Sequence, residues 1–167
     1  MFYLILIPFI VQMIAIGLDE YCFHLKRNLP TWERIGHPLD TLSVLGCFIF
    51  VQSVPFSSGA LKVFIGLAIL SCLLITKDEF VHKHHCPVKE MWLHALLFVN
   101  HSVMLAALAI SWCALAKTPP VWILTWLDNK EFLKLFLEIQ SVGIGIFMFY
   151  QIIYWNFIVP PYEKESD

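Results

Sequence analysis

Charged residues are scarce in this sequence. Only 14% of the 167 residues are Asp, Glu, Lys or Arg, whereas 59% are hydrophobic and the mean hydropathy is +0.72. A typical soluble domain has about 25% charged residues. The composition therefore favours an integral membrane protein over a soluble globular one, with residues 1–167 forming a single membrane domain.

The sequence also lacks the motifs of several other protein classes. The net charge is −2 and no basic run is present, so we expect no nucleic-acid partner. The five cysteines are scattered without a Cys-x-x-Cys pair, which argues against a disulfide framework and against a thiolate zinc site. The sequence also lacks a Gly-x-Gly-x-x-Gly fingerprint for flavin or nicotinamide. A redox enzyme of this sequence would need a separate electron-donor protein.

Long apolar runs dominate what is present, and five of them approach the length that crosses a bilayer. The first run lacks a basic segment before it, so we expect it to be retained as a span and not removed as a signal peptide. Trp122 and Trp126 favour the headgroup region and predict an interfacial segment over 117–131. The fold expected is an all-α integral membrane protein with an acidic tail at 160–167 and transmembrane helices at 1–18, 39–54, 61–76, 92–116 and 132–159.

The basic residues predict the orientation of these spans. The connections after the first and third spans lie on the same side of the membrane and hold six of them, Lys26, Arg27, Arg34, Lys77, Lys83 and Lys89. The opposite side holds four, Lys62, Lys117, Lys130 and Lys134. The positive-inside rule therefore places the N-terminus outside and the two richer connections in the cytosol.

The same two connections contain a repeated polar pattern. Each copy has an Asp-Glu pair, a His three or four residues after the Glu, and a Pro-x-x-Glu-x-x-x-His motif that opens the next apolar run. The copies are Asp19-Glu20, His24 and 30–37, and Asp78-Glu79, His82 and 87–94. This pattern indicates a tandem repeat over 1–58 and 59–116, so we expect the first four helices to form a bundle of two two-helix repeats, followed by a fifth span within 132–159.

Carboxylate and imidazole side chains in this pattern are spaced to share helix faces. Residues four apart lie on one face of an α-helix, which applies to Glu20/His24, Glu33/His37, Asp78/His82 and Glu90/His94. At about 100° per residue, Asp40 and His101 remain near the same faces. We therefore predict a shared metal site at the cytosolic ends of the helices. The candidate ligands are Glu20, His24, Glu33, His37, Asp40, Asp78, Glu79, His82, His85, Glu90, His94 and His101.

The chemistry of these ligands suits hard or borderline metals. Imidazoles and carboxylates without paired thiolates favour iron, with zinc or manganese as alternatives. Four such pairs are enough for two ions, as in the di-iron carboxylate sites of four-helix bundles. A single Glu-x-x-x-His is common on helix surfaces, and Asp19, Glu33 or Glu90 could simply cap a helix or face a positive helix N-terminus. Four pairs at one membrane face favour a metal site, because ionisable groups near hydrocarbon are costly.

Two short motifs resemble those of known di-iron proteins. His82-x-His84-His85 resembles the histidine boxes of integral-membrane desaturases and hydroxylases, and Glu79-x-x-His82 resembles the Glu-x-x-His element of soluble ferritin-like bundles. The resemblance implies two iron ions and activation of molecular oxygen.

The first functional hypothesis is thus a membrane-embedded di-iron oxidoreductase that oxidises or desaturates a lipid-like substrate taken from the membrane. The alternatives are a membrane protein that binds or transports metal, and a zinc-dependent lipid hydrolase. Transport would need polar groups through the membrane depth, but His101 is the only histidine well inside a span. Haem ligation by His94 or His101 is disfavoured by the neighbouring carboxylates. Glu138 could face the bundle interior or lie outside it.

Overall fold

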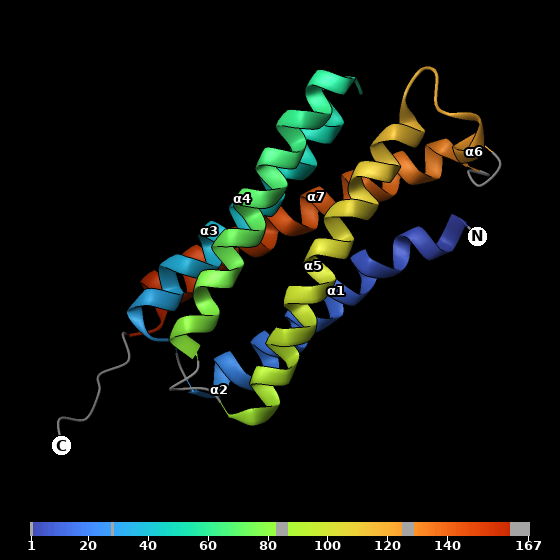
Figure 1. The fold of residues 1–167 in the computed structure, drawn as a ribbon. Coiled ribbons are helices and arrows are strands. Elements are labelled where there is room, and N and C mark those ends of the chain that lie inside the picture. Colours follow the sequence, from blue (N-terminus) through green and yellow to red (C-terminus); the bar gives the residue numbers. More distant parts are fainter. Residues whose placement is uncertain (1, 28, 83–86, 125–128, 161–167) are drawn as a thin grey trace.

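The computed structural model describes residues 2–27, 29–82, 87–124 and 129–160, and among these it does not describe the side chains of 2, 27, 77–82 and 123–124. All regular secondary structure in the described residues is helical. Five helical segments are long and apolar enough to cross a membrane, which confirms the prediction of an all-α protein with five such segments (Figure 1). They are Tyr3–His24, Thr31–Ser53, Ser58–Thr76, Val88–Leu115 and Lys130–Ile158.

The first and fifth segments combine several helix types. The first is built from a 3-10 turn, helix α1 and a π-helical turn, at Phe2–Leu6, Ile7–Asp19 and Glu20–His24, and the short helix α2, Leu25–Arg27, follows it. The fifth consists of α7, Lys130–Ile153, and a π-helical turn, Tyr154–Ile158. The other helices are α3, Thr31–Ser53; α4, Ser58–His82; α5, Val88–Leu115; and α6, Val121–Leu124.

Two helices begin earlier than their apolar runs predict. Helix α3 begins at Thr31 instead of residue 39, and α5 begins at Val88 instead of residue 92. Each follows an extended proline, Pro30 with ψ 154° and Pro87 with ψ 153°. A proline is suited to this place, because no N–H is needed before the first turn. The described parts of the predicted polar connections are therefore largely helical, and those acids and histidines whose side chains are described, from Asp19 to His37 and at Glu90 and His94, are buried or half-buried.

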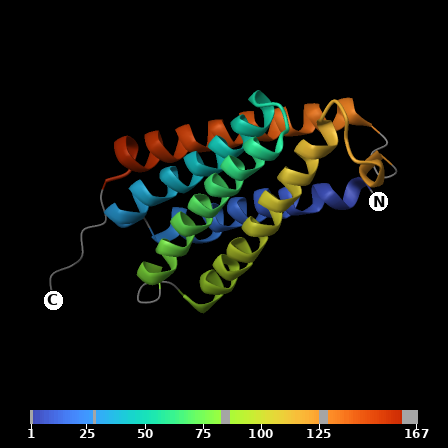
Figure 2. The ribbon, with the colours of Figure 1, turned by 45° about the horizontal axis from the view of Figure 1, so that its top comes forward.

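The long helices pack as a bundle in which α3 contacts α7 and α4, and α5 contacts α1 and α4 (Figures 1 and 2). Aromatic side chains fill the end of the bundle opposite the polar motifs. Trp112, which is 3% exposed, contacts the rings of Phe50, Phe56 and Phe64. Its indole N–H donates a 2.9 Å hydrogen bond to the carbonyl of Val54.

Much of the outer surface is apolar. Ile69 of α4 is 57% exposed and Phe149 of α7 is 60% exposed, and similar residues cover the other long helices. Soluble monomers rarely expose apolar surface on this scale. The outward faces therefore match the surroundings of an integral membrane protein.

Arg34 of α3 fixes the end of the fifth segment. Its guanidinium, in a side chain only 4% exposed, donates hydrogen bonds to the carbonyls of Trp155, Val159 (2.7 Å) and Pro160 (2.5 Å). Carbonyls at a helix C-terminus lack partners within the helix and attract positive charge. The Asn156 amide in turn donates a hydrogen bond to the Arg34 carbonyl at 3.4 Å. This carbonyl lacks its usual helical partner, because Pro38, four residues later, has no N–H. These bonds hold the end of the fifth segment beside the polar end of the bundle.

Candidate metal centre

The π-helical turn at the end of α1 arranges three ionisable side chains. Asp19, Glu20 and His24 are 6%, 8% and 4% exposed. Nδ1 of His24 lies 3.1 Å from Oε2 of Glu20, four residues earlier, and Nε2 lies 3.3 Å from Oδ2 of Asp19, five residues earlier. The wider turn thus places both carboxylates against one imidazole. Such turns occur frequently at functional sites.

The two Pro-x-x-Glu-x-x-x-His motifs have the same local structure. In each, the glutamate lies in the first turn of a long helix and is buried, with Glu33 1% and Glu90 0% exposed. The histidine follows one turn later and is half-buried. Nε2 of His37 lies 3.8 Å from Oε2 of Glu33, and Nε2 of His94 lies 3.1 Å from Oδ1 of Asp19. Both motifs therefore direct ligand atoms to the end of α1.

These side chains form two groups that can each hold a metal ion. One ligand atom from each of Asp19, His24, Glu90 and His94 lies within 4.8 Å of the others, and the same holds for His24, Glu33 and His37. His24 belongs to both groups, and its ring centroid lies 4.9 Å from that of His37. The prediction of a His/carboxylate cluster that can bind metal is confirmed in this form. The identity of the metal does not follow from the geometry.

Hydrogen bonds orient His24 within the cluster. Oε1 of Glu20 accepts hydrogen bonds from the Tyr150 hydroxyl at 2.7 Å and from the Trp155 indole at 3.0 Å. Its second oxygen accepts from Nδ1 of His24. A neutral His24 then has its lone pair on Nε2, which has no hydrogen-bond donor among the described residues. Carboxylates commonly orient metal-binding histidines in this way.

The position of that lone pair favours a bound cation. Nε2 of His24 faces Oδ2 of Asp19 at 3.3 Å and Oε1 of Glu90 at 3.9 Å. A lone pair and two carboxylate oxygens repel one another unless a proton or a metal ion lies among them. Burial strengthens that repulsion, since the local dielectric is low. The donor set therefore fits a divalent cation.

A cavity of about 510 Å³ extends from the cluster into the bundle. Asp19, His24, His37 and His94 line one end, and the remaining wall is mostly apolar, reaching Phe9 and Met104. Its volume lies within the range of small-molecule sites, roughly 300 to 1,000 Å³. The cluster thus adjoins an apolar space large enough for a ligand.

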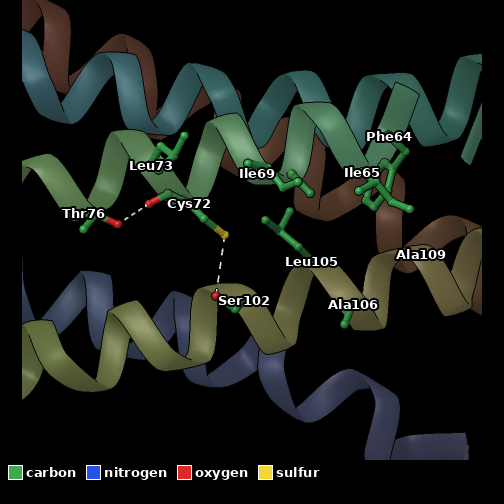
Figure 3. A pocket seen from close by; sticks show the side chains of 11 residues that line it. Phe64, Ile65, Ile69, Cys72, Leu73, Thr76, Ser102, Leu105, Ala106 and Ala109 are labelled. Carbon is green, nitrogen blue, oxygen red and sulfur yellow. Dashed lines mark hydrogen bonds between the residues drawn. The ribbon is translucent and has the colours of Figure 1, made fainter. Parts of the chain in front are cut away.

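A second hollow of about 360 Å³ lies between α4 and α5 (Figure 3). Its wall is apolar, with Cys72 and Ser102 facing each other at 3.6 Å between Sγ and Oγ. No histidine or carboxylate is among the described residues that line it. Among the described residues that line it, this hollow therefore lacks the paired imidazoles and carboxylates of the cluster.

The structure separates the predicted ligands into several sets. His24, Glu33, His37, Glu90 and His94 come together in the two groups, whereas Glu20 contacts His24 from behind. Asp40 and His101 line the cavity, and Nε2 of His101 lies 3.0 Å from Ser71 Oγ. The side chains of Asp78, Glu79 and His82, and the whole of His84 and His85, lie outside the described residues. Glu138 is exposed and pairs with Lys134 at 3.9 Å, so it does not face the interior.

Sequence reasoning missed Asp19, Tyr150 and Trp155. The α-helical spacing does not pair Asp19 with His24, because residues five apart do not share an α-helical face. The only available signal was its place beside Glu20 in the repeated Asp-Glu pair. The aromatic residues of the fifth span gave no signal of their own, since their contact with Glu20 joins residues 130 and 135 positions apart.

Comparisons with protein-family models, curated proteins and solved structures found no match to this chain. The function must therefore be inferred from the geometry of the site itself.

Proposed function

We propose that the protein is a membrane-embedded, metal-dependent oxidoreductase whose His/carboxylate cluster holds two iron ions and acts on a lipid-like substrate. The observation that carries this proposal is the place of His24, which belongs to both ligand groups at the end of an apolar cavity. Two adjacent groups favour two ions over one. An apolar cavity beside them favours a hydrocarbon substrate over a soluble one.

The donor set supports iron as the metal. Together the groups contain three imidazoles and three carboxylates, from His24, His37, His94, Asp19, Glu33 and Glu90. Such ligands suit iron, manganese or zinc, and di-iron sites in helical bundles use the same types. Asp78, Glu79, His82 and His85 remain predicted additions from the end of α4 and the connection after it. Iron bound there would supply the activation of molecular oxygen.

The residues around the cluster have distinct roles in this proposal. Asp19, Glu33 and Glu90 balance the charge of the ions within a buried space. Glu20 holds the His24 ring in place, and Tyr150 and Trp155 hold Glu20. The apolar cavity wall excludes water and places a hydrocarbon against the cluster. These roles are those that oxidation or desaturation of a lipid requires from the protein.

The proposal includes a topology and a partner. We place the cluster on the cytosolic side and the N-terminus outside, as the distribution of basic residues predicts. An electron-donor protein would then act from the cytosol. The matching local structure of 30–37 and 87–94 supports an origin by duplication of a two-helix unit.

Spectroscopy of the iron-loaded protein tests this function. Protein loaded with ⁵⁷Fe(II) without oxygen and then oxidised should give the Mössbauer spectrum of a coupled iron pair. Oxygen uptake with reductant and membrane lipid should depend on His24 and be lost in His24→Ala. A mononuclear iron spectrum, or equal oxygen uptake by His24→Ala, would contradict the proposal. Zinc in place of iron, with release of fatty acid from lipid, would identify the hydrolase alternative.

A further inference from the structure

The first membrane-crossing segment, Tyr3–His24, contacts α7 at two positions along its length. Toward the aromatic end of the bundle, the rings of Phe9 and Phe136 meet edge to face with centroids 5.6 Å apart. At the polar end of the bundle, beside the His/carboxylate cluster, the Tyr150 hydroxyl donates a hydrogen bond to Glu20 at 2.7 Å. The eleven steps along the chain from Phe9 to Glu20 span about 16 Å at 1.5 Å per residue. Over that length the described backbones of the two helices do not pack closely.

The cavity reaches the outer surface between these two positions. Met13 and Gly17 of α1, and Ile139 and Gly143 of α7, all line it. Met13 is 56% exposed and Ile139 is 60% exposed, so side chains of the cavity wall are also part of the surface. A Cβ atom added at Gly17 or Gly143 would meet no heavy atom within 4 Å. The two glycines therefore border open space on both helices.

This opening lies within membrane-crossing segments. Gly17 belongs to Tyr3–His24 and Gly143 to Lys130–Ile158, both apolar. A molecule that approaches from the side at this depth must be a hydrocarbon, because polar solutes do not partition there. Inside, the cavity leads in one direction to His24 and in the other to Met104, which is only 3% exposed.

We propose that the opening between α1 and α7 is a lateral window through which the hydrocarbon chain of a membrane lipid enters the cavity. Gly17 and Gly143 keep the window open, and Met104 limits how deeply the chain extends. The inference rests on the proposed function for what then happens to the chain at the cluster. It identifies the substrate class as lipids with a chain that can leave the bilayer sideways.

Photolabelling in a membrane tests the window. The protein would be placed in phosphatidylcholine vesicles that contain palmitic acid with a mid-chain diazirine, illuminated, and mapped by mass spectrometry. Val103, which is 49% exposed, faces outward and reports labelling from the bilayer, whereas buried Met104 reports labelling from the cavity. We expect Met104 to be labelled in the wild type. Absence of that label, with Val103 labelled, would overturn the proposal.

Substitution of the glycines makes the test specific. In Gly17→Trp and Gly143→Trp the ratio of Met104 to Val103 labelling should fall about tenfold, since an indole fills the opening. Gly66→Trp in α4 is the matched control, because a Cβ there also meets no atom within 4 Å and Gly66 does not line the cavity. Its ratio should equal that of the wild type. Gly143→Leu should lower the ratio of Met104 to Val103 labelling by a smaller amount, and it replaces the Trp variants in the test if they do not fold.

Metal content measured on the same samples separates this inference from the proposed function. Unchanged Met104 labelling in both window variants would overturn the window, even in protein that binds metal. Window-dependent labelling in protein without metal would support the window and contradict the proposed oxidation.

Discussion

The two ends of the bundle are both buried but differ in chemistry. At one end Trp112 packs edge to face against Phe50 and Phe56 and at a tilt against Phe64, which stabilises the fold through apolar burial. At the other, Asp19, Glu33 and Glu90 are buried together, which is costly unless cations balance them. The aromatic end therefore contributes stability, whereas the polar end costs stability unless a cation is bound there. Variants at the aromatic end should therefore mainly change stability, whereas variants at the polar end should mainly change metal binding.

The largest effect should come from the aromatic end. Trp112→Ala removes a buried indole and should lower the free energy of unfolding by about 3 to 5 kcal/mol. Metal content per folded molecule should not change, because the cluster lies at the other end. Denaturant unfolding with metal analysis of the folded fraction would measure both. A large loss of metal from folded Trp112→Ala would show that the ends are not independent.

His24→Ala should have the next largest effect, on metal affinity. Because His24 belongs to both groups, the affinity for metal should fall by more than about 100-fold. This exceeds the usual effect of losing a residue that only hydrogen-bonds to a metal ligand. Competition with a chelator would measure the dissociation constant. His101→Ala is the control, since His101 lines the cavity outside both groups and should keep most of the affinity. Similar losses in both variants would place the metal elsewhere.

Tyr150→Phe should weaken metal binding about tenfold, at the low end for residues that orient a ligand. It removes one of the two described donors to Oε1 of Glu20, and Trp155 retains the other. Chelator competition again applies. Tyr154→Phe is the matched control, because the described contacts of Tyr154 are ring contacts with Tyr150 and Trp155. Equal affinities in all three proteins would remove Tyr150 from the site.

The smallest effect should come from Glu90→Gln, whose effect on stability should have opposite signs in the metal-free and metal-loaded protein. Glu90→Gln removes one of two carboxylates that lie within 4.8 Å of each other, so repulsion in the metal-free protein decreases. The metal-free protein should gain about 1 kcal/mol of stability, a size typical of relieved functional sites. The metal-loaded protein should lose stability instead. Melting curves with metal and with chelator would show both changes, and destabilisation in both would refute the idea of a costly cluster.

The sequence predicted the helices and most of the residues in the two candidate groups because both follow from local rules. A spacing of four places Glu33 with His37 on one helix face wherever the helix begins. The helix boundaries were less predictable, because charged residues resemble connections until their burial is known. Asp19 depends on a π turn, which the α-helical period does not include. Tyr150 depends on how the fifth segment is held by Arg34, a contact between residues more than 100 positions apart.

Elemental analysis of the wild-type protein tests the central claim most directly. The protein would be expressed with iron, zinc and manganese supplied, purified in detergent without chelator, and its metal content determined per chain. We expect stoichiometric transition metal, with iron predominant. Protein that is folded and carries no stoichiometric transition metal would contradict it.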